Sequence, residues 1–261
     1  MPTTLSTYAT IARNLTRSLS TTAAKPQVAR ESAYYLANIG KAKSIDDFLG
    51  NRRLLTFAMK AYGLQDMAYA KAFMRKVLTE GIDKAGSFAN GLSDKRYKQF
   101  AEAFNFARYG ATATTFERTR QGTVDRYVRQ TLEEDAGAQN EGVRLALYFE
   151  RNAAKIESAY GILADPALLK VVQTALGMPA ATSAINIDRQ AEMIAKRLDI
   201  DDLKDPTKLN RFLSRFASLW ELSNPTTTPA SAATLITQPL GVSGIGLDVL
   251  ATLQNLKLGG H

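Results

Sequence analysis

Adjacent carboxylates are the side chains of this sequence best placed for acid–base chemistry. They occur as Asp46/Asp47, Glu133/Glu134/Asp135 and Asp201/Asp202. Catalysis by a carboxylate pair requires one acid in an apolar setting and one in a solvated setting, so that their pKa values separate. Runs of acids at helix ends more often cap the helix and balance its dipole. We therefore interpret these acids as structural.

Most other kinds of active site lack a residue type that they need. The sequence has no cysteine, and its single histidine is residue 261. This excludes thiol chemistry and thiolate metal sites, and a terminal histidine is a poor acid–base group or zinc ligand. Asp199, Asp201 and Asp202 lack the spacing and the glycine of a calcium loop. We predict no catalytic, metal-binding or cofactor-binding residues, and therefore not an enzyme.

A glycine cluster near the C-terminus has some features of a phosphate-binding loop. It comprises Gly241, Gly244 and Gly246 ahead of an expected helix. A dinucleotide fingerprint needs a strand before the glycines and a βαβ unit around them, and neither is predicted here. No cofactor is expected.

The charge balance is basic, with a formal net charge of +8. Clustered cations fall in two neighbouring expected helices: Lys71, Arg75 and Lys76, then Lys95, Arg96 and Lys98. They are either solvated outer faces of amphipathic helices or a surface for nucleic acid, anionic lipid or an acidic protein. The nearby aromatics have helical spacing, which favours core packing over base stacking: Tyr97, Phe100 and Phe104, and Phe212, Phe216 and Trp220. Nucleic acid is therefore the alternative partner, not the leading one.

The elements that position these residues are predicted to be helices throughout. Apolar side chains recur at intervals of three and four, and the alternation typical of strands is scarce. Ser44, Asp165 and Asp205 are expected N-caps, and Gly63 an expected helix end. Helices are expected over 115–135 and 139–160, with a turn at 135–140. No apolar run reaches the ~20 residues of a membrane span, so no transmembrane segment is predicted.

The same helical pattern occurs twice. Residues 51–64 align with residues 165–178 at a constant offset of 114. The same offset pairs Tyr34 with Tyr148 and Asn38 with Asn152, and an offset of 112 downstream pairs Phe100 with Phe212 and Phe104 with Phe216. The pattern predicts an all-α, multi-helix body made of two tandem, related helical units.

Five segments follow from this pattern. They are an amphipathic N-terminal arm (1–30), helical unit 1 (31–112), a connecting helix and turn (113–142), helical unit 2 (143–222), and a flexible linker with a C-terminal helix bearing Leu247, Leu250, Leu253 and Leu256 (223–261). The acid-free arm either docks on the body or on a partner, or is a disordered export signal, or is a transit peptide. Both ends are expected to be mobile, so removing residues 1–24 or 225–261 should leave a folded core.

Several unbroken stretches resemble an alphaproteobacterial family of unknown function that is often encoded among flagellar genes. They include residues 30–35, 44–47, 58–64, 66–73, 76–78, 94–97, 104–107, 130–134 and 143–151. The resemblance implies a role in building, exporting or regulating the flagellum, and it implies no catalytic residues. We expect a non-enzymatic structural, assembly or regulatory protein that acts through protein–protein contacts. It would be cytoplasmic, or exported to the flagellum without a cleaved secretory signal, and its oligomeric state stays open. The alternative is a basic, nucleic-acid-binding regulatory protein.

Overall fold

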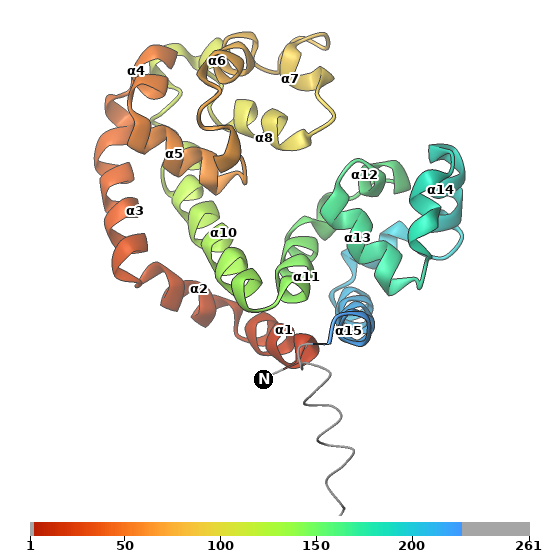
Figure 1. The fold of residues 1–261 in the computed structure, drawn as a ribbon. Coiled ribbons are helices and arrows are strands. Elements are labelled where there is room, and N and C mark those ends of the chain that lie inside the picture. The colour runs from red at the N-terminus through yellow and green to blue at the C-terminus, as the bar shows by residue number, and fades with distance from the viewer. Residues whose placement is uncertain (1–2, 226–261) are drawn as a thin grey trace, which may run out of the picture. The chain divides into compact units, whose positions relative to one another are not determined.

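The computed structural model describes residues 3–225, and the fold over these residues is all-α, without a β-strand (Figure 1). The predicted fold class is therefore confirmed. The α-helices are α1 (Thr4–Arg13), α2 (Leu15–Ala23), α3 (Pro26–Asn38), α4 (Ile45–Gly50), α5 (Arg52–Ala61), α6 (Lys71–Glu80), α7 (Phe88–Gly91), α8 (Lys95–Ala103), α9 (Phe106–Tyr109), α10 (Gln121–Gln139), α11 (Glu141–Asn152), α12 (Ala159–Leu163), α13 (Pro166–Ala175), α14 (Ile187–Ala195) and α15 (Pro206–Ser223). Short 3-10 turns link them: η1 (Ile39–Lys41), η2 (Gln65–Met67), η3 (Gly110–Thr112), η4 (Glu117–Thr119), η5 (Ala153–Lys155), η6 (Ala180–Ala184) and η7 (Ile200–Lys204).

The predicted helix caps are present. Ser44 and Asp47 form a capping box at the start of α4. Asp165 and Asp205 accept backbone N–H bonds at the starts of α13 and α15, each followed by a proline. Proline tolerates this position because its missing N–H would have no partner inside the helix. These helix starts are therefore determined by local sequence.

Residues 34–64 and 148–178 share local structure at the predicted offset of 114. Asn38 and Asn152 each donate a side-chain hydrogen bond to the carbonyl of the tyrosine four residues earlier, over 2.8 and 2.9 Å, and a 3-10 turn follows each asparagine. Gly63 and Gly177 have φ of +68° and +63°. The residue after each glycine donates a backbone bond of 2.8 Å to a carbonyl five residues back, which closes both helices in the same way.

The predicted pairing at an offset of 112 is wrong. Phe100 and Phe104 lie on or beside α8, which packs on α6 and α7, whereas Phe212 and Phe216 lie on α15, which packs on α1, α11 and α13. In its packing, α10 is the counterpart of α15. Helix α10 lies against α3 and α5, and α15 lies against the corresponding pair, α11 and α13. Residues 124–128 (VDRYV) match residues 209–213 (LNRFL) at an offset of 85. The chain between α6 and η4 comprises residues 81–116, whereas the chain between α14 and η7 comprises only residues 196–199. The longer connection, 81–116, contains α8 and has no counterpart after α14.

Two hydrophobic clusters hold the described residues together. The first runs from Val28 to Val128 and the second includes Tyr8 and residues from Ala136 to Phe216. Helix α10, which we expected to be a connector beginning near residue 113, begins at Gln121 and supplies Val124, Tyr127 and Val128 to the first cluster.

The turn predicted at 135–140 is wrong, because α10 continues to Gln139. Asn140 alone separates α10 from α11, and its side chain caps α11. Gly137 remains inside the helix, where an added Cβ would lie 2.7 Å from Cδ of Arg144. The glycine therefore permits close contact between α10 and α11.

The N-terminal arm is docked on the body. Tyr8 on α1 is 2% exposed and belongs to the second cluster, and α1 packs on α11 and α15. The backbone N–H of Thr4 donates to Glu221 on α15 over 2.8 Å, and Asn140 donates to the Thr4 hydroxyl over 2.9 Å. The expectation that this arm is mobile is therefore wrong, and docking on the body is the alternative that the structure has. Removal of residues 1–24 would uncover the second cluster. Helix α3 also crosses the boundary expected at residue 30.

The predicted linker and C-terminal helix over 223–261 lie outside the described residues from residue 226 onward, and the cluster at Gly241, Gly244 and Gly246 lies there too.

Candidate functional site

The adjacent carboxylates do not gather into one site. Asp46 pairs with Arg75, Asp47 closes the capping box, and Asp201 and Asp202 pair with Lys204 and Lys208 over 2.7 and 2.5 Å. Glu134 and Asp135 pair with Lys60 and Lys25, each over 2.7–2.8 Å. These interactions support the interpretation of the acids as structural groups.

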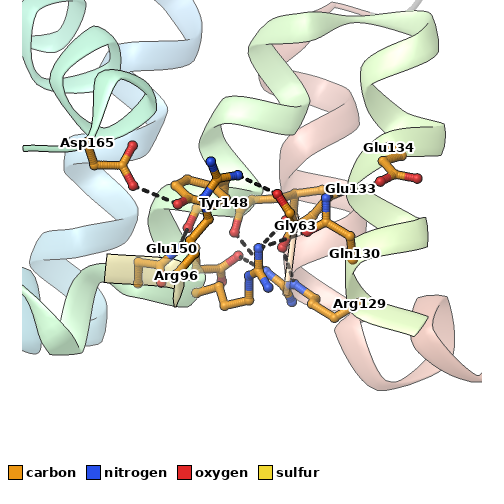
Figure 2. A network of polar contacts seen from close by, with 12 residues as sticks. Gly63, Arg96, Arg129, Gln130, Glu133, Glu134, Tyr148, Glu150 and Asp165 are labelled. Atoms are coloured by element: carbon orange, nitrogen blue, oxygen red, sulfur yellow. Dashed lines mark hydrogen bonds and ion pairs between the residues drawn. The ribbon is translucent and has the colours of Figure 1, made fainter. Parts of the chain in front are cut away.

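Glu133 differs from its neighbours because it is buried. Its side chain is 2% exposed and accepts hydrogen bonds from Nε of Arg129, over 2.9 Å, and from Nη2 of Arg151, over 2.8 Å (Figure 2). Nη2 of Arg129 also donates to the carbonyl of Leu147 over 2.9 Å. The network therefore ties α10 to α11 through charge-assisted bonds, which are stronger than neutral ones.

Glu150 lies at the edge of this network. Burial raises the pKa of Glu150, and the Arg129 guanidinium, 3.5 Å away, opposes that shift. Burial and then the Glu150 charge also raise the pKa of Tyr8, so the network reaches α1. The centre of the network is closed to a dissolved substrate, because the side chains of Glu133 and Arg129 are 2% and 10% exposed, whereas Arg151 and Glu150 at its edge are 20% and 26% exposed. The arrangement stabilises a helix junction.

The sequence contained one signal for this network. Arg129 and Glu133 lie four residues apart on α10, which favours an ion pair along a helix. Arg151 comes from the next helix, and nothing in the spacing of the residues pointed to it.

An exposed apolar face lies at α12 and α14, and sequence reasoning missed it. Five large hydrophobic side chains are exposed in the described part of the chain, and three of them lie here: Tyr160 (51%), Ile185 (41%) and Ile187 (54%). The Tyr160 hydroxyl donates to Asp188 over 2.8 Å, which joins α12 to the first turn of α14. We call Tyr160, Ile185, Ile187 and Asp188 the α12–α14 face.

The aromatics beside the basic helices are core residues, as predicted. Tyr97, Phe100 and Phe104 are buried, and Phe100 and Phe104 pack at 4.8 Å between ring centroids. Phe216 is also buried, with Phe212 and Trp220 partly so. These rings are not presented for base stacking. Lys71, Lys95 and Lys98 are exposed on α6 and α8.

Within residues 3–225, no group of histidine or acidic side chains has a geometry that could hold a metal ion. Asp199 caps its own turn by accepting the N–H of Asp201 over 3.0 Å. Across the same residues, no helix is long and apolar enough to cross a membrane.

Comparison with known families identifies the chain. A family model described as "Protein of unknown function (DUF1217)" matches residues 61–209. The chain belongs to this family. It is also similar to the X-ray crystal structure of a protein from the alphaproteobacterium Agrobacterium tumefaciens, with 48% sequence identity and a TM-score of 0.78. The similarity covers 84% of this chain and 93% of the Agrobacterium chain. A comparison with curated proteins finds no significant match.

Proposed function

We propose that this DUF1217 protein is a non-enzymatic structural or assembly protein of the flagellum, and that it acts through protein–protein contacts. The flagellar context comes from the sequence resemblance, and the contact surface from the α12–α14 face. On this proposal, the matched stretches at 34–64 and 148–178 are the cores of two tandem units that form a rigid body, and the body presents that face to a partner.

The observation that carries the proposal is the exposure of Tyr160, Ile185 and Ile187 together. Single exposed apolar residues are ordinary, but a group of them marks an interaction site more often than chance placement does. Tyrosine is also enriched at interfaces, because it buries a large area at a small cost in side-chain entropy. The Tyr160–Asp188 bond holds the ring in place before a partner binds.

A motility assay tests this proposal. In a strain lacking the protein, the full-length chain carrying Tyr160→Ser and Ile187→Ser should fail to restore swimming and should be lost from purified flagellar basal bodies. Its melting temperature should stay within a few degrees of wild type, because both side chains are exposed. Tyr69→Ser is the matched control, since Tyr69 is 81% exposed and lies outside the α12–α14 face. Normal swimming and normal basal-body association of the double variant would refute the proposal.

A nucleic-acid-binding regulator is the second candidate, favoured by Lys71, Lys95 and Lys98, which have no carboxylate partner among the described residues. Its affinity for DNA or RNA should fall steeply with salt and should weaken in a triple lysine-to-glutamine variant. Undetectable binding at low salt would eliminate this candidate.

A further inference from the structure

A groove between α3, α5 and α10 has a lining that its structural counterpart lacks. The groove has a volume of about 490 Å³ and is lined by Gln27, Glu31, Arg52, Arg53, Thr56, Phe57, Lys60 and Tyr127. This volume is in the range of small-molecule sites.

The floor of the groove is aromatic. Phe57 and Tyr127 stack with their ring centroids 3.9 Å apart, and Tyr35 stacks on the other side of Phe57 at 4.4 Å. These contacts cover both faces of Phe57 and one face of Tyr127, and the two side chains are 3% and 7% exposed, so a ligand would meet the fixed edges of the two rings. Such edges favour a flat, apolar ligand body.

The rim of the groove carries charge, and most of that charge is already neutralised. Arg53 holds Glu31 through two hydrogen bonds of 2.8 and 3.0 Å, and Lys60 pairs with Glu134 over 2.8 Å. Arg52 is exposed and forms no ion pair or hydrogen bond with any residue that the structure describes. Arg52, Thr56 and Lys60 follow one another at four-residue intervals, so they lie along one side of α5. The free charge of the rim is therefore positive.

Comparison with α11, α13 and α15 shows that the fold does not need these charges. At the offset of 114, Glu31, Arg53 and Lys60 correspond to Leu145, Ala167 and Thr174. At the offset of 85, Glu134 and Tyr127 correspond to Leu219 and Phe212. Leu145 is 4% exposed and is part of the second cluster. The positions that correspond to Glu31, Arg53 and Lys60 thus carry apolar or neutral side chains, although the position that corresponds to Thr56 carries Lys170.

We propose that the α3–α5–α10 groove binds a small aromatic anion, whose ring packs against the edges of Phe57 and Tyr127. Its negative group is held by Arg52 with Thr56, and by Lys60, which shares its charge with Glu134. This site is independent of the α12–α14 face and of the flagellar proposal.

Fluorescence titration with anilinonaphthalene sulfonate, an aromatic anion, tests the site on the full-length chain. Saturable binding is expected, and Arg52→Ala combined with Lys60→Thr should weaken it about tenfold or more, the loss expected for a hydrogen bond to a charged group. Phenylnaphthylamine, which has the rings without the sulfonate, should bind both proteins equally. This result would show that the Arg52→Ala, Lys60→Thr variant has lost recognition of the negative charge of the ligand and not of its rings.

A grafted variant separates loss of the site from loss of the fold. Glu31→Leu, Arg53→Ala and Lys60→Thr together install the residues found at the corresponding positions of the second cluster. This variant should melt like wild type but bind the sulfonate probe more weakly, because it keeps Arg52 and lacks Lys60. Lys170→Thr is the matched control, because Lys170 occupies the position of Thr56 on α13, and it should bind normally. Equal affinity of wild type and the grafted variant for the sulfonate, or no saturable binding by wild type, would overturn the proposal.

Discussion

The stretches at 34–64 and 148–178 have the same turns and caps but different charges. In each stretch a glycine in the left-handed conformation follows the helix, α5 in the first and α13 in the second. In each, an asparagine side chain also donates a hydrogen bond to a tyrosine carbonyl. Around α5, however, Glu31, Arg53 and Lys60 form ion pairs, whereas their counterparts around α13 are uncharged. The two stretches therefore share backbone-directed hydrogen bonds and helix ends, and the charges around α5 are additional to these.

The buried junction between α10 and α11 should be the most sensitive place in the molecule, and the groove charges should be far less so. Glu133→Ala removes the buried carboxylate that both Arg129 and Arg151 bind, leaves Arg129 with only the longer 3.5 Å contact to Glu150, and should lower the free energy of unfolding by about 3 kcal/mol. Glu134→Ala removes the adjacent carboxylate, which is 30% exposed, and should cost less than about 1 kcal/mol. Urea unfolding measures both values. Similar losses would show that the two carboxylates have equivalent roles.

Exchanging residues between the two stretches should succeed in only one direction. Leu145→Glu places a carboxylate in the second cluster without the arginine that Glu31 has, and should cost about 3 kcal/mol or more. Glu31→Leu lies at a partly exposed rim and should change stability by less than about 1 kcal/mol. Thermal unfolding of the two single variants checks this. A tolerated Leu145→Glu would mean that the second cluster has room for a charged group.

The two glycines should respond alike if the stretches share their geometry. Gly63→Ala and Gly177→Ala force a side chain into a left-handed conformation, and each should cost about 1–2 kcal/mol. Gly50→Ala is the control, because it has no positive φ and no atom within 4 Å of an added Cβ. A clear difference between Gly63→Ala and Gly177→Ala would break the correspondence.

The smallest effect is expected at Glu150, and it should depend on pH. Its pKa is raised above 4.5 in the folded protein, so ionisation of Glu150 favours the unfolded chain. Stability therefore falls as the pH rises from about 4.5 through the raised pKa of the folded protein. Glu150→Gln removes this loss and should stabilise the protein at neutral pH by less than about 1 kcal/mol, with no difference below about pH 4. Chemical unfolding across that pH range provides the measurement. A variant that is less stable at neutral pH would show that the Arg129 contact outweighs burial.

Local sequence predicted the helices well, because their boundaries depend on neighbouring residues. Ser44, Asp165 and Asp205 cap helices, and Gly63 ends one, through bonds that reach only a few residues along the chain. The helical class could be predicted for the same reason.

Contacts between distant residues could not be predicted from local patterns. The partner of Glu133 on α11 and the burial of Tyr8 under α15 depend on how the helices pack. The error at Phe100 and Phe212 had a related cause: both helices have phenylalanines four residues apart, and spacing alone does not reveal that residues 81–116 are additional. The α12–α14 face was missed because exposure is a tertiary property, and Ile185 and Ile187 read as ordinary apolar residues.

The hydrogen bond between Thr4 and Glu221 joins residues 217 positions apart. During synthesis, α1 is made before α11 and α15, on both of which it packs, so its binding place is incomplete until α15 has been made. Contacts of such long separation form late, because the intervening chain must be ordered before the two ends meet. A growing chain would thus leave part of α1 uncovered, and completion of α15 would bury it.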